Sequence, residues 1–343
     1  MNKVLKNTDS LRIYSLLYSK IRLVRNINKY PFVSSMSKDE KDEVYAQLLD
    51  ILSRNSLDFS LLNDQINDQT DNVSNIDFNY ALYLADEERK IDKNIVLVNK
   101  FNTVLDINRG NHIEFYNYSF KSDFLHLYKN ITTLEEIFEN YFNFYATKRF
   151  GFLSPKINDT GLGLKVSTVL HLPGFTALAN RNALFEDFNK RGYEIKEWKF
   201  EGKCYKNFYV ASSNLNFGVS EDKLLERFQL GINSILDMEN VELLKFYDKN
   251  KEGFVDIILR SYGILSYATK LKFEETIEYL SNILIGLKLG TLKVKNWSLF
   301  DLGELFSAIL SNKLLSEFNK TDNDEAQREI IKKFISNIGA IND

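Results

Sequence analysis

Cysteine is nearly absent from this sequence, with Cys204 the only one among 343 residues. A disulfide within the chain is therefore excluded, and so is a metal site built from several thiolates. Histidine is also scarce: His112, His126 and His171 show no i,i+4 pairing that would place two imidazoles on one helix face. We expect no metal site formed by protein side chains alone.

Long apolar runs are missing as well. No stretch approaches the roughly 18 consecutive apolar residues of a membrane helix. Residues 1–20 have neither an uninterrupted apolar core nor a small-residue cleavage site. The single cysteine fits a reducing compartment, so the sequence predicts a cytoplasmic protein without a membrane segment.

Neither sign of charge dominates. The chain has 44 Lys and Arg residues and 47 Asp and Glu residues, which gives a net charge of −3. No overall field would attract nucleic acid or an anionic membrane, so any phosphate-binding surface must be local. Hydrophobic residues make up 44% and aromatic residues 13% of the chain, which is ample for a core. The length favours two packed units.

The first unit, residues 1–240, has the pattern of an α+β domain with an antiparallel sheet flanked by helices. Ser37 and Glu40 form a capping-box pattern that predicts a helix to about Arg54, and Thr133 with Glu136 repeats it. Residues 63–79 lack periodicity and indicate a long surface loop. The pattern predicts strands at 94–99, 103–107, 112–118, 164–172, 193–200 and 208–212, and further helices at 133–149, 175–190 and from 220 onward.

The second unit, residues 241–343, shows helical periodicity without strand signals, so we expect an all-α domain. The predicted helices are 254–268, 273–289, 298–318 and 324–338.

A glycine-bearing loop precedes the predicted strand at 164–172. It reads SPKINDTGLG from Ser154 to Gly163 and is followed closely by Lys165. Glycines next to a cation let the backbone approach a phosphate, although Gly161 and Gly163 are equally typical of a turn that enters a strand.

Several stretches, in this order and spacing, resemble the ATP:guanidino phosphotransferases, the phosphagen kinase family, and in particular the bacterial protein arginine kinases. They are YSKIRLVRNINKYPF (18–32), LDINRGNHIEF (105–115), GFLSPKINDTGLGLKVSTVLHLP (151–173), SSNLNFGVSE (212–221) and RSYGILSYATKL (260–271). The resemblance implies a catalytic domain that uses ATP and Mg, followed by a helical domain that binds phosphoarginine.

At the positions where the resemblance implies phosphate contacts, this chain has few arginines. The nucleotide-binding positions are Lys20, Arg22, Gly161, Gly163 and Lys165, and only Arg22 keeps the family's arginine. A lysine supplies charge but not the planar fork of an arginine.

At the positions that contact the guanidine substrate, the family chemistry is lost. Arg109 and Gly110 replace the two orienting acids, Glu114 replaces a phosphate-contacting arginine, and Lys156 replaces the reactive cysteine. A lysine at position 156 would repel a guanidinium.

In the last predicted helix, the resemblance implies that Glu325 and Arg328 bind phosphoarginine. A guanidinium needs an acid and a phosphate needs a cation. Their i,i+3 spacing equally fits a surface ion pair.

Three hypotheses follow. The preferred one is a catalytically impaired relative, a pseudokinase that acts as a regulator or adaptor in cytosolic protein quality control, with protein partners such as a chaperone–protease system and a possible homodimer. The second is an active kinase with a remodelled site, in which Glu87 or Glu88 replaces the missing acids. The third is a phosphoarginine-binding module.

Overall fold

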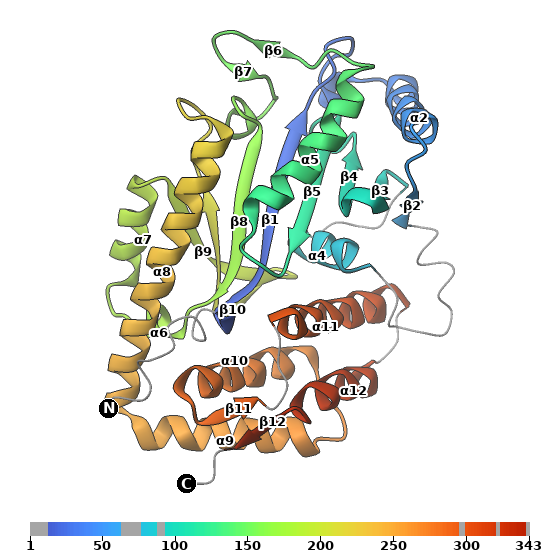
Figure 1. Ribbon diagram of the computed structural model, residues 1–343. Helices are drawn as coiled ribbons and strands as arrows, with labels where there is room; N and C mark the ends of the chain where they lie inside the picture. Colours follow the sequence, from blue (N-terminus) through green and yellow to red (C-terminus); the bar gives the residue numbers. More distant parts are fainter. Residues whose placement is uncertain (1–12, 63–76, 88–92, 295–298, 320–322, 341–343) are drawn as a thin grey trace.

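The computed structural model describes residues 13–62, 77–87, 93–294, 299–319 and 323–340. Within them, an eight-stranded sheet has the order β2-β3-β4-β5-β1-β8-β10-β9 (Figure 1). Its strands are β1 (Leu16–Arg25), β2 (Phe59–Leu61), β3 (Ile95–Val98), β4 (Thr103–Ile107), β5 (Ile113–Ser119), β8 (Leu164–His171), β9 (Tyr193–Phe200) and β10 (Lys203–Ser213). Every pairing between neighbours is antiparallel, which confirms the predicted mixed fold.

Strand β1 lies in the middle of the sheet, between β5 and β8, and the sequence analysis did not predict it as a strand. Its side chains alternate between the two faces, as the pleat requires. Ile21 and Leu23 belong to the core cluster that includes the buried residues of helix α5 (Phe124–Glu139). Lys20 and Arg22 therefore lie on the opposite face.

The capping box at Ser37 is confirmed at the start of helix α2 (Lys38–Arg54), with both reciprocal hydrogen bonds present. The prediction of a second capping box at Thr133 is wrong. Helix α5 starts nearly three turns earlier, where the Asp123 side chain accepts a hydrogen bond from the backbone of His126. Thr133 lies inside the helix and donates its hydroxyl to the carbonyl of Lys129, an i−4 bond that any helical threonine can make.

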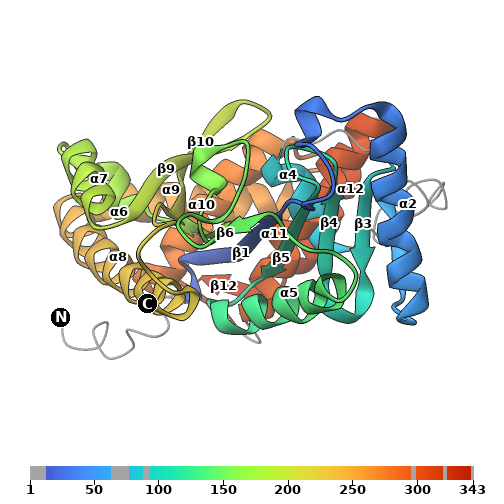
Figure 2. The ribbon, with the colours of Figure 1, turned by 90° about the horizontal axis from the view of Figure 1, so that it is seen from above.

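The helix predicted at 175–190 is two helices, α6 (Pro173–Ala177) and α7 (Arg181–Lys190), because the backbone at Leu178 is extended. Helix α8 (Glu221–Lys249) follows and runs along the sheet beside α5. Figure 2 shows α5 and α8 on one side of the sheet.

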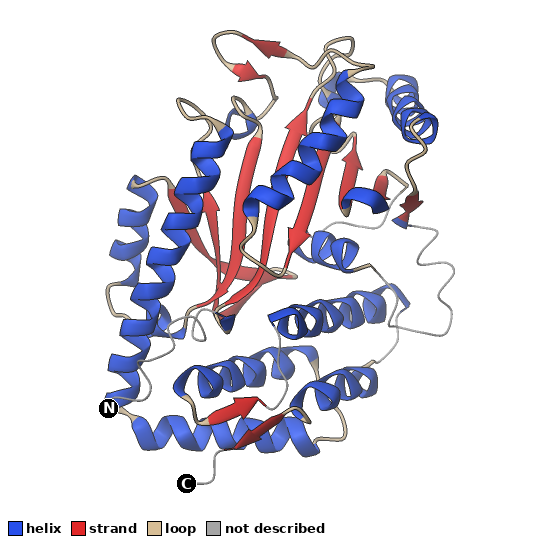
Figure 3. Cartoon of the chain, viewed as in Figure 1, coloured by secondary structure: helices blue, strands red, loops and turns tan. Residues whose placement is uncertain are grey.

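The second half consists of α9 (Lys251–Tyr267), α10 (Phe273–Leu289), α11 (Leu299–Asn319) and α12 (Asp324–Ile335). It is not entirely helical, because β11 (Leu292–Val294) pairs with β12 (Ile338–Ala340). Figure 3 shows this small sheet among the helices. The helix predicted to reach residue 338 ends at Ile335 for the same reason. Helix α8 continues through residue 240, so the predicted domain division there stays a prediction.

The helical half packs directly on the face of the sheet that carries Lys20. Phe306 of α11 lies with its ring centroid 6.1 Å from that of Tyr18, 5.4 Å from Trp198 and 6.2 Å from Phe208. These buried side chains belong to one hydrophobic cluster. The sheet and the helical half therefore share a core.

The described residues also form α4 (Phe78–Glu87), β6 (Ala146–Thr147), β7 (Gly151–Phe152) and 3-10 turns at Val33–Ser35, Asn99–Phe101 and Ile157–Asp159. The predicted loop at 63–79 lies mostly outside the described residues. None of the described helices is long and apolar enough to cross a membrane.

Candidate functional site

The sheet register brings several of the predicted residues to one face. Arg22 of β1 lies opposite Tyr116 of β5 on one side and Lys165 of β8 on the other. Glu114 lies two residues from Tyr116 on β5, so its side chain points to the same face.

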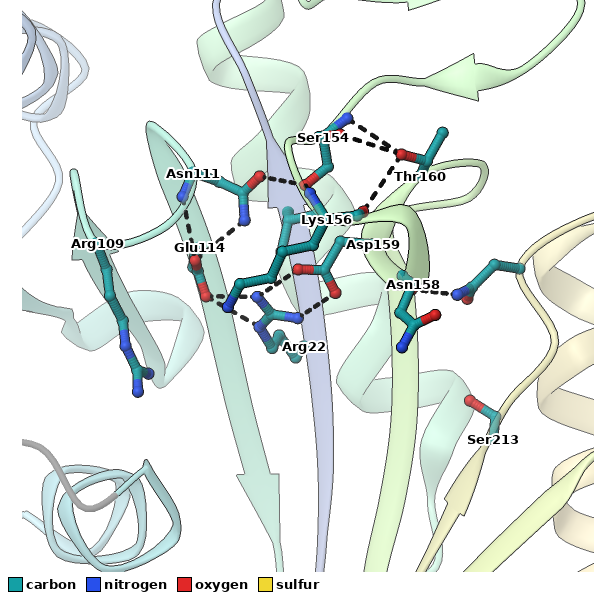
Figure 4. Close-up of polar contacts among 12 residues, drawn as sticks. Arg22, Arg109, Asn111, Glu114, Ser154, Lys156, Asn158, Asp159, Thr160 and Ser213 are labelled. Atoms are coloured by element: carbon teal, nitrogen blue, oxygen red, sulfur yellow. Dashed lines mark hydrogen bonds and ion pairs between the residues drawn. The ribbon is translucent and has the colours of Figure 1, made fainter. Parts of the chain in front are cut away.

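The guanidinium of Arg22 is held by two carboxylates (Figure 4). Its Nε and Nη2 atoms lie 2.9 and 2.7 Å from Oε2 of Glu114. On its other edge, Nη1 and Nη2 lie 2.7 and 3.1 Å from the two oxygens of Asp159. This is the bidentate geometry in which arginine binds a carboxylate most strongly.

Glu114 is itself fully hydrogen-bonded. Its Oε1 atom accepts from the backbone and side-chain nitrogens of Asn111 at 3.2 and 3.1 Å. Its Oε2 atom also accepts from the Tyr116 hydroxyl at 2.8 Å. Every polar atom of this carboxylate therefore has a partner within the protein.

The charges of this cluster stabilise one another. Burial would raise the pKa of Glu114, but Arg22 and the hydrogen bonds from Tyr116 and Asn111 lower it below its ordinary value. Burial would lower the pKa of Arg22, yet Tyr116, Glu114 and Asp159 raise it well above its ordinary value. The ion pair is therefore fully charged at neutral pH.

The loop predicted to approach phosphate supplies Asp159 and is fixed to the end of the sheet. The Ser154 hydroxyl donates to Oδ1 of Asn111 at 2.8 Å, and Thr160 bonds back to Ser154 across the loop. Lys156 is exposed, and its Nζ atom would lie 3.7 Å from a Cβ atom at Gly110. The same Cβ atom would lie 3.3 Å from Oε1 of Glu114, so Lys156 and Glu114 both border Gly110.

The two loop glycines have structural reasons to be glycine. Gly161 has φ +107° and Gly163 has φ +64°. A Cβ atom would lie 2.2 Å from the carbonyl oxygen of Asn216 at the first position and 2.8 Å from that of Val24 at the second. The Gly161 N–H donates to the carbonyl of Phe152, so that N–H has a partner within the protein.

Lys20, which lies on the same face of β1 as Arg22, is also paired with an acid. Its Nζ atom lies 2.9 Å from Asp86 of α4, and the Tyr18 hydroxyl donates to the same carboxylate. Lys165 differs from Lys20 and Arg22, because none of the described carboxylates lies within ion-pair distance of it. Burial of its stem lowers the pKa of Lys165, opposed by Glu194 and reinforced by Lys20.

A cavity of about 510 Å³ opens on this face. Its lining includes Lys20, Asp86, Lys165, Glu194, Lys196 and Trp198. Two of its lysines are neutralised, Lys20 by Asp86 and Lys196 by Glu194 at 2.6 Å. With Lys199 and Glu197 counted, the cavity is lined by four lysines and three acids, so it is polar and its net charge is small.

Arg109 lies at the edge of the cluster and touches it through the Tyr116 hydroxyl. Its Nε atom lies 3.7 Å from Asp106, and its Nη1 atom lies 3.3 Å from the Tyr116 hydroxyl. Figure 4 shows its side chain pointing away from Lys156. Glu88, considered as a replacement acid, lies outside the described residues, and Glu87 is the last residue of α4.

Glu325 and Arg328, the residues predicted to bind phosphoarginine, do not form an ion pair with each other. Arg328 bonds instead to Glu329 and donates from Nε to the carbonyl of Ala268 at 3.3 Å. Glu325 is exposed. Their joint binding of phosphoarginine stays a prediction.

A second cavity of about 210 Å³ lies between the N-terminal ends of helices α10 and α12. Asn312 and Gln327 line it and are 3% and 2% exposed. They bond to each other at 2.8 Å, which leaves Oδ1 of Asn312 and Nε2 of Gln327 without a partner. Buried amides with an unused acceptor and an unused donor indicate a place for a polar ligand or water.

Two of the histidines are structural. His112 accepts at Nδ1 from the backbone of Ile27 at 2.8 Å, and its Nε2 atom lies 2.9 Å from the carbonyl of Pro31. His171 is buried against Ser281 of α10 at 2.9 Å. In the described part of the chain, no three His, Cys, Asp or Glu side chains gather as a metal site would require.

The sequence analysis missed Asp86, which pairs with Lys20, and Asp159, which binds the second edge of Arg22. Asp159 stood inside the glycine-bearing loop, but nothing in its spacing indicated that it reaches Arg22. Asp86 is separated from Lys20 by 66 residues of sequence, so only the folded chain brings them together.

Comparison with known proteins covers nearly the whole chain. Residues 23–242 match the family described as ATP:guanido phosphotransferase, C-terminal catalytic domain. Residues 251–340 match the family described as protein-arginine kinase McsB C-terminal domain.

Curated relatives have the same extent. The chain is 26% identical over 322 residues to the protein-arginine kinase of Halothermothrix orenii, with 92% of each chain covered. It is 26% identical over 324 residues to the protein-arginine kinase of Staphylococcus aureus (strain USA300), with 93% of each covered.

Solved structures share the fold at lower identity. The duplicated taurocyamine kinase from Schistosoma mansoni aligns with a TM-score of 0.55 at 16% identity, over 72% of this chain and 37% of that one. Lombricine kinase aligns with a TM-score of 0.51 at 16% identity, over 66% of each. With a matching catalytic-domain family over most of its length, followed by the C-terminal domain of protein-arginine kinases, this chain belongs to the ATP:guanido phosphotransferase family.

Proposed function

We propose that this protein is a non-catalytic member of its family, a pseudokinase that acts as a regulator or adaptor in cytoplasmic protein quality control. The observation that carries the proposal is the Arg22 guanidinium held between Glu114 and Asp159. The lost acids at positions 109 and 110 point the same way.

Phosphoryl transfer depends on cations placed where charge develops on the transferred group. Arg22 has no unused edge to offer, because Glu114 and Asp159 occupy both sides of its guanidinium. Withdrawing Arg22 toward a phosphate would leave Glu114 buried without its cation, which costs about 3–5 kcal/mol. The negative charge of Glu114 would itself repel a phosphate.

The same cluster disfavours a guanidine substrate. A substrate guanidinium needs carboxylates to orient it, and the carboxylates here are Glu114 and Asp159. Both already bind the guanidinium of Arg22, so neither carboxylate is free to orient a substrate guanidinium.

ATP and Mg, which the family implies, do not fit the side chains of this face. A nucleotide triphosphate carries several negative charges, whereas the four lysines that line the cavity on this face stand among three acids, Asp86, Glu194 and Glu197. We therefore assign no step to ATP.

What supports a binding role is the integrity of the rest of the fold. The eight-stranded sheet and the shared core with the helical half are complete within the described residues. Protein partners of a chaperone–protease system, and self-association into a homodimer, are part of this proposal by family resemblance.

The decisive experiment measures transfer of radiolabelled γ-phosphate from ATP to arginine residues of a protein substrate. The protein-arginine kinase of Staphylococcus aureus, assayed alongside, shows that the conditions support the reaction. We expect no arginine phosphorylation by this chain. Transfer that is lost in Arg22→Ala would overturn the proposal in favour of an active kinase with a remodelled site.

A second candidate function is phosphoarginine binding by the helical half, favoured by the unpaired amide atoms of Asn312 and Gln327. The first turns of α10 and α12 supply uncapped backbone N–H groups at the same cavity, and such groups attract anions. Calorimetric titration of the full chain with phosphoarginine, with arginine as the control ligand, tests this function. Gln327→Ala should weaken binding, and equal affinity for both ligands would contradict it.

A further inference from the structure

A small hairpin projects beyond the end of the main sheet and exposes apolar side chains. Strands β6 and β7 pair only with each other in their sheet, and they stand at the top of the molecule in Figure 1. Phe150, in the turn between them, is 46% exposed, and Ile157 in the following loop is 79% exposed. Phe217, which is 51% exposed, lies against Gly161 next to them.

This projecting surface is held firmly at its base. The Tyr145 N–H donates to the carbonyl of Asn26 at 2.7 Å, and the Asn26 side chain donates to the carbonyl of Leu153 at 3.0 Å. The Arg25 guanidinium lies 3.5 Å from the ring centroid of Phe152. A surface that is ordered before binding loses less conformational entropy when a partner docks.

The same surface carries cations that no acid neutralises. Lys148 and Arg149 lie in the hairpin turn, and both are exposed. Over the described ranges, neither has a carboxylate within ion-pair distance, whereas Lys20, Arg22 and Lys196 on the sheet face all do. Charge complementarity therefore favours an acidic partner.

We propose that the hairpin surface, formed by Lys148, Arg149, Phe150, Ile157 and Phe217, docks an acidic protein segment that also carries apolar side chains. The apolar residues would fill the contact centre and the cations would steer and orient the segment. This inference rests on the proposed adaptor role and gives the chemistry of its partner. It does not depend on phosphotransfer, so a failure here would leave the kinase assay unaffected.

Nucleic acid is a less suitable occupant. Its binding is dominated by many phosphate contacts, but this surface offers two cations on a chain with net charge −3. Apolar side chains such as Ile157 match a peptide better than a phosphate backbone. A second copy of the chain would have to present an acidic face, and this is an outcome of the test.

The test uses fluorescence anisotropy with the full chain and a labelled synthetic peptide that alternates glutamate and leucine. We expect saturable binding that weakens as salt rises from about 0.05 to about 0.3 M, because screening shortens the reach of the charges. Lys148→Glu combined with Arg149→Glu should weaken binding about tenfold, and Phe150→Ser should do so separately.

The matched control reverses Lys332 and Lys333, an exposed pair of neighbouring lysines in the last turn of α12. This variant should bind the peptide like the wild type. A peptide that alternates glutamate and serine should bind weakly, because it lacks the apolar half of the contact.

Four results would overturn the proposal. They are absence of saturable binding, equal losses in the hairpin and control variants, tighter binding of a single-stranded oligonucleotide of the same charge, and self-association of the chain that the hairpin variants abolish. Circular dichroism of each variant confirms that it is folded.

Discussion

Arg22 and Glu114 form a buried ion pair across two neighbouring strands, with Nη2 and Oε2 2.7 Å apart. By family resemblance, both positions belong to phosphate-binding arginines. In this chain one of them has become an acid, and the pair is neutral as a unit. Asp159, from the adjacent loop, binds the remaining edge of the same guanidinium.

Removing the Glu114 carboxylate should destabilise the fold. Glu114→Ala leaves Arg22 with one carboxylate partner and Asn111 without its acceptor, so we expect a loss of about 3 kcal/mol in the free energy of unfolding. Urea denaturation measures it. The control, Asp50→Ala, breaks an exposed i,i+4 pair with Arg54 and should change stability by no more than about 0.5 kcal/mol. Equal small effects would show that the buried cluster contributes little.

The contact between Phe306 and the sheet should be a major link between the two halves. Phe306→Ala removes a fully buried ring that packs on Tyr18, Trp198 and Phe208, at a cost of about 3–5 kcal/mol. Tyr267→Ala removes a ring that is 85% exposed and should be nearly neutral. Thermal unfolding of both variants compares them. A nearly neutral Phe306→Ala would mean that the helical half does not depend on this contact.

The pH dependence of stability should reflect Glu239, which is buried in α8. Burial raises its pKa from 4.5 to about 7, although Lys288 and the N–H groups of Gly174 and Phe175 oppose the shift. A raised pKa means that the folded state binds the proton more tightly, so this contribution is present below about pH 4.5 and is lost as pH rises to about 7. The stability of wild type relative to Glu239→Gln should therefore fall over that range. Denaturant midpoints measured at several pH values give the difference, and a constant difference would rule out the shift.

Much of the sheet could be predicted from sequence because its signals are local. The strands at 95–98, 103–107 and 193–200 show apolar runs or alternation between short polar turns, and the Ser37 capping box lies within one helical turn. The pattern at Thr133 gave a wrong helix start, because a threonine followed by a glutamate three residues later also occurs inside helices. The strands β11 and β12 have three residues each, too few for a periodic pattern.

The site itself could be predicted only in part. The family motifs located Lys20, Arg22, Glu114 and Lys156, and their replacements indicated lost chemistry. The partners of the cations were not predictable, because Asp86 and Asp159 reach them from distant segments through the fold. The resemblance implied free phosphate-binding cations at positions 20 and 22, and the structure places a carboxylate on each.

The most direct test of this account is calorimetric titration of the purified protein with ATP and Mg, for the wild type and for Arg22→Ala. If Glu114 and Asp159 retain the Arg22 guanidinium, the wild type should show no saturable binding at millimolar ATP, and Arg22→Ala should behave in the same way. Saturable binding by the wild type that disappears in Arg22→Ala would show that Arg22 contacts phosphate, and would contradict the account.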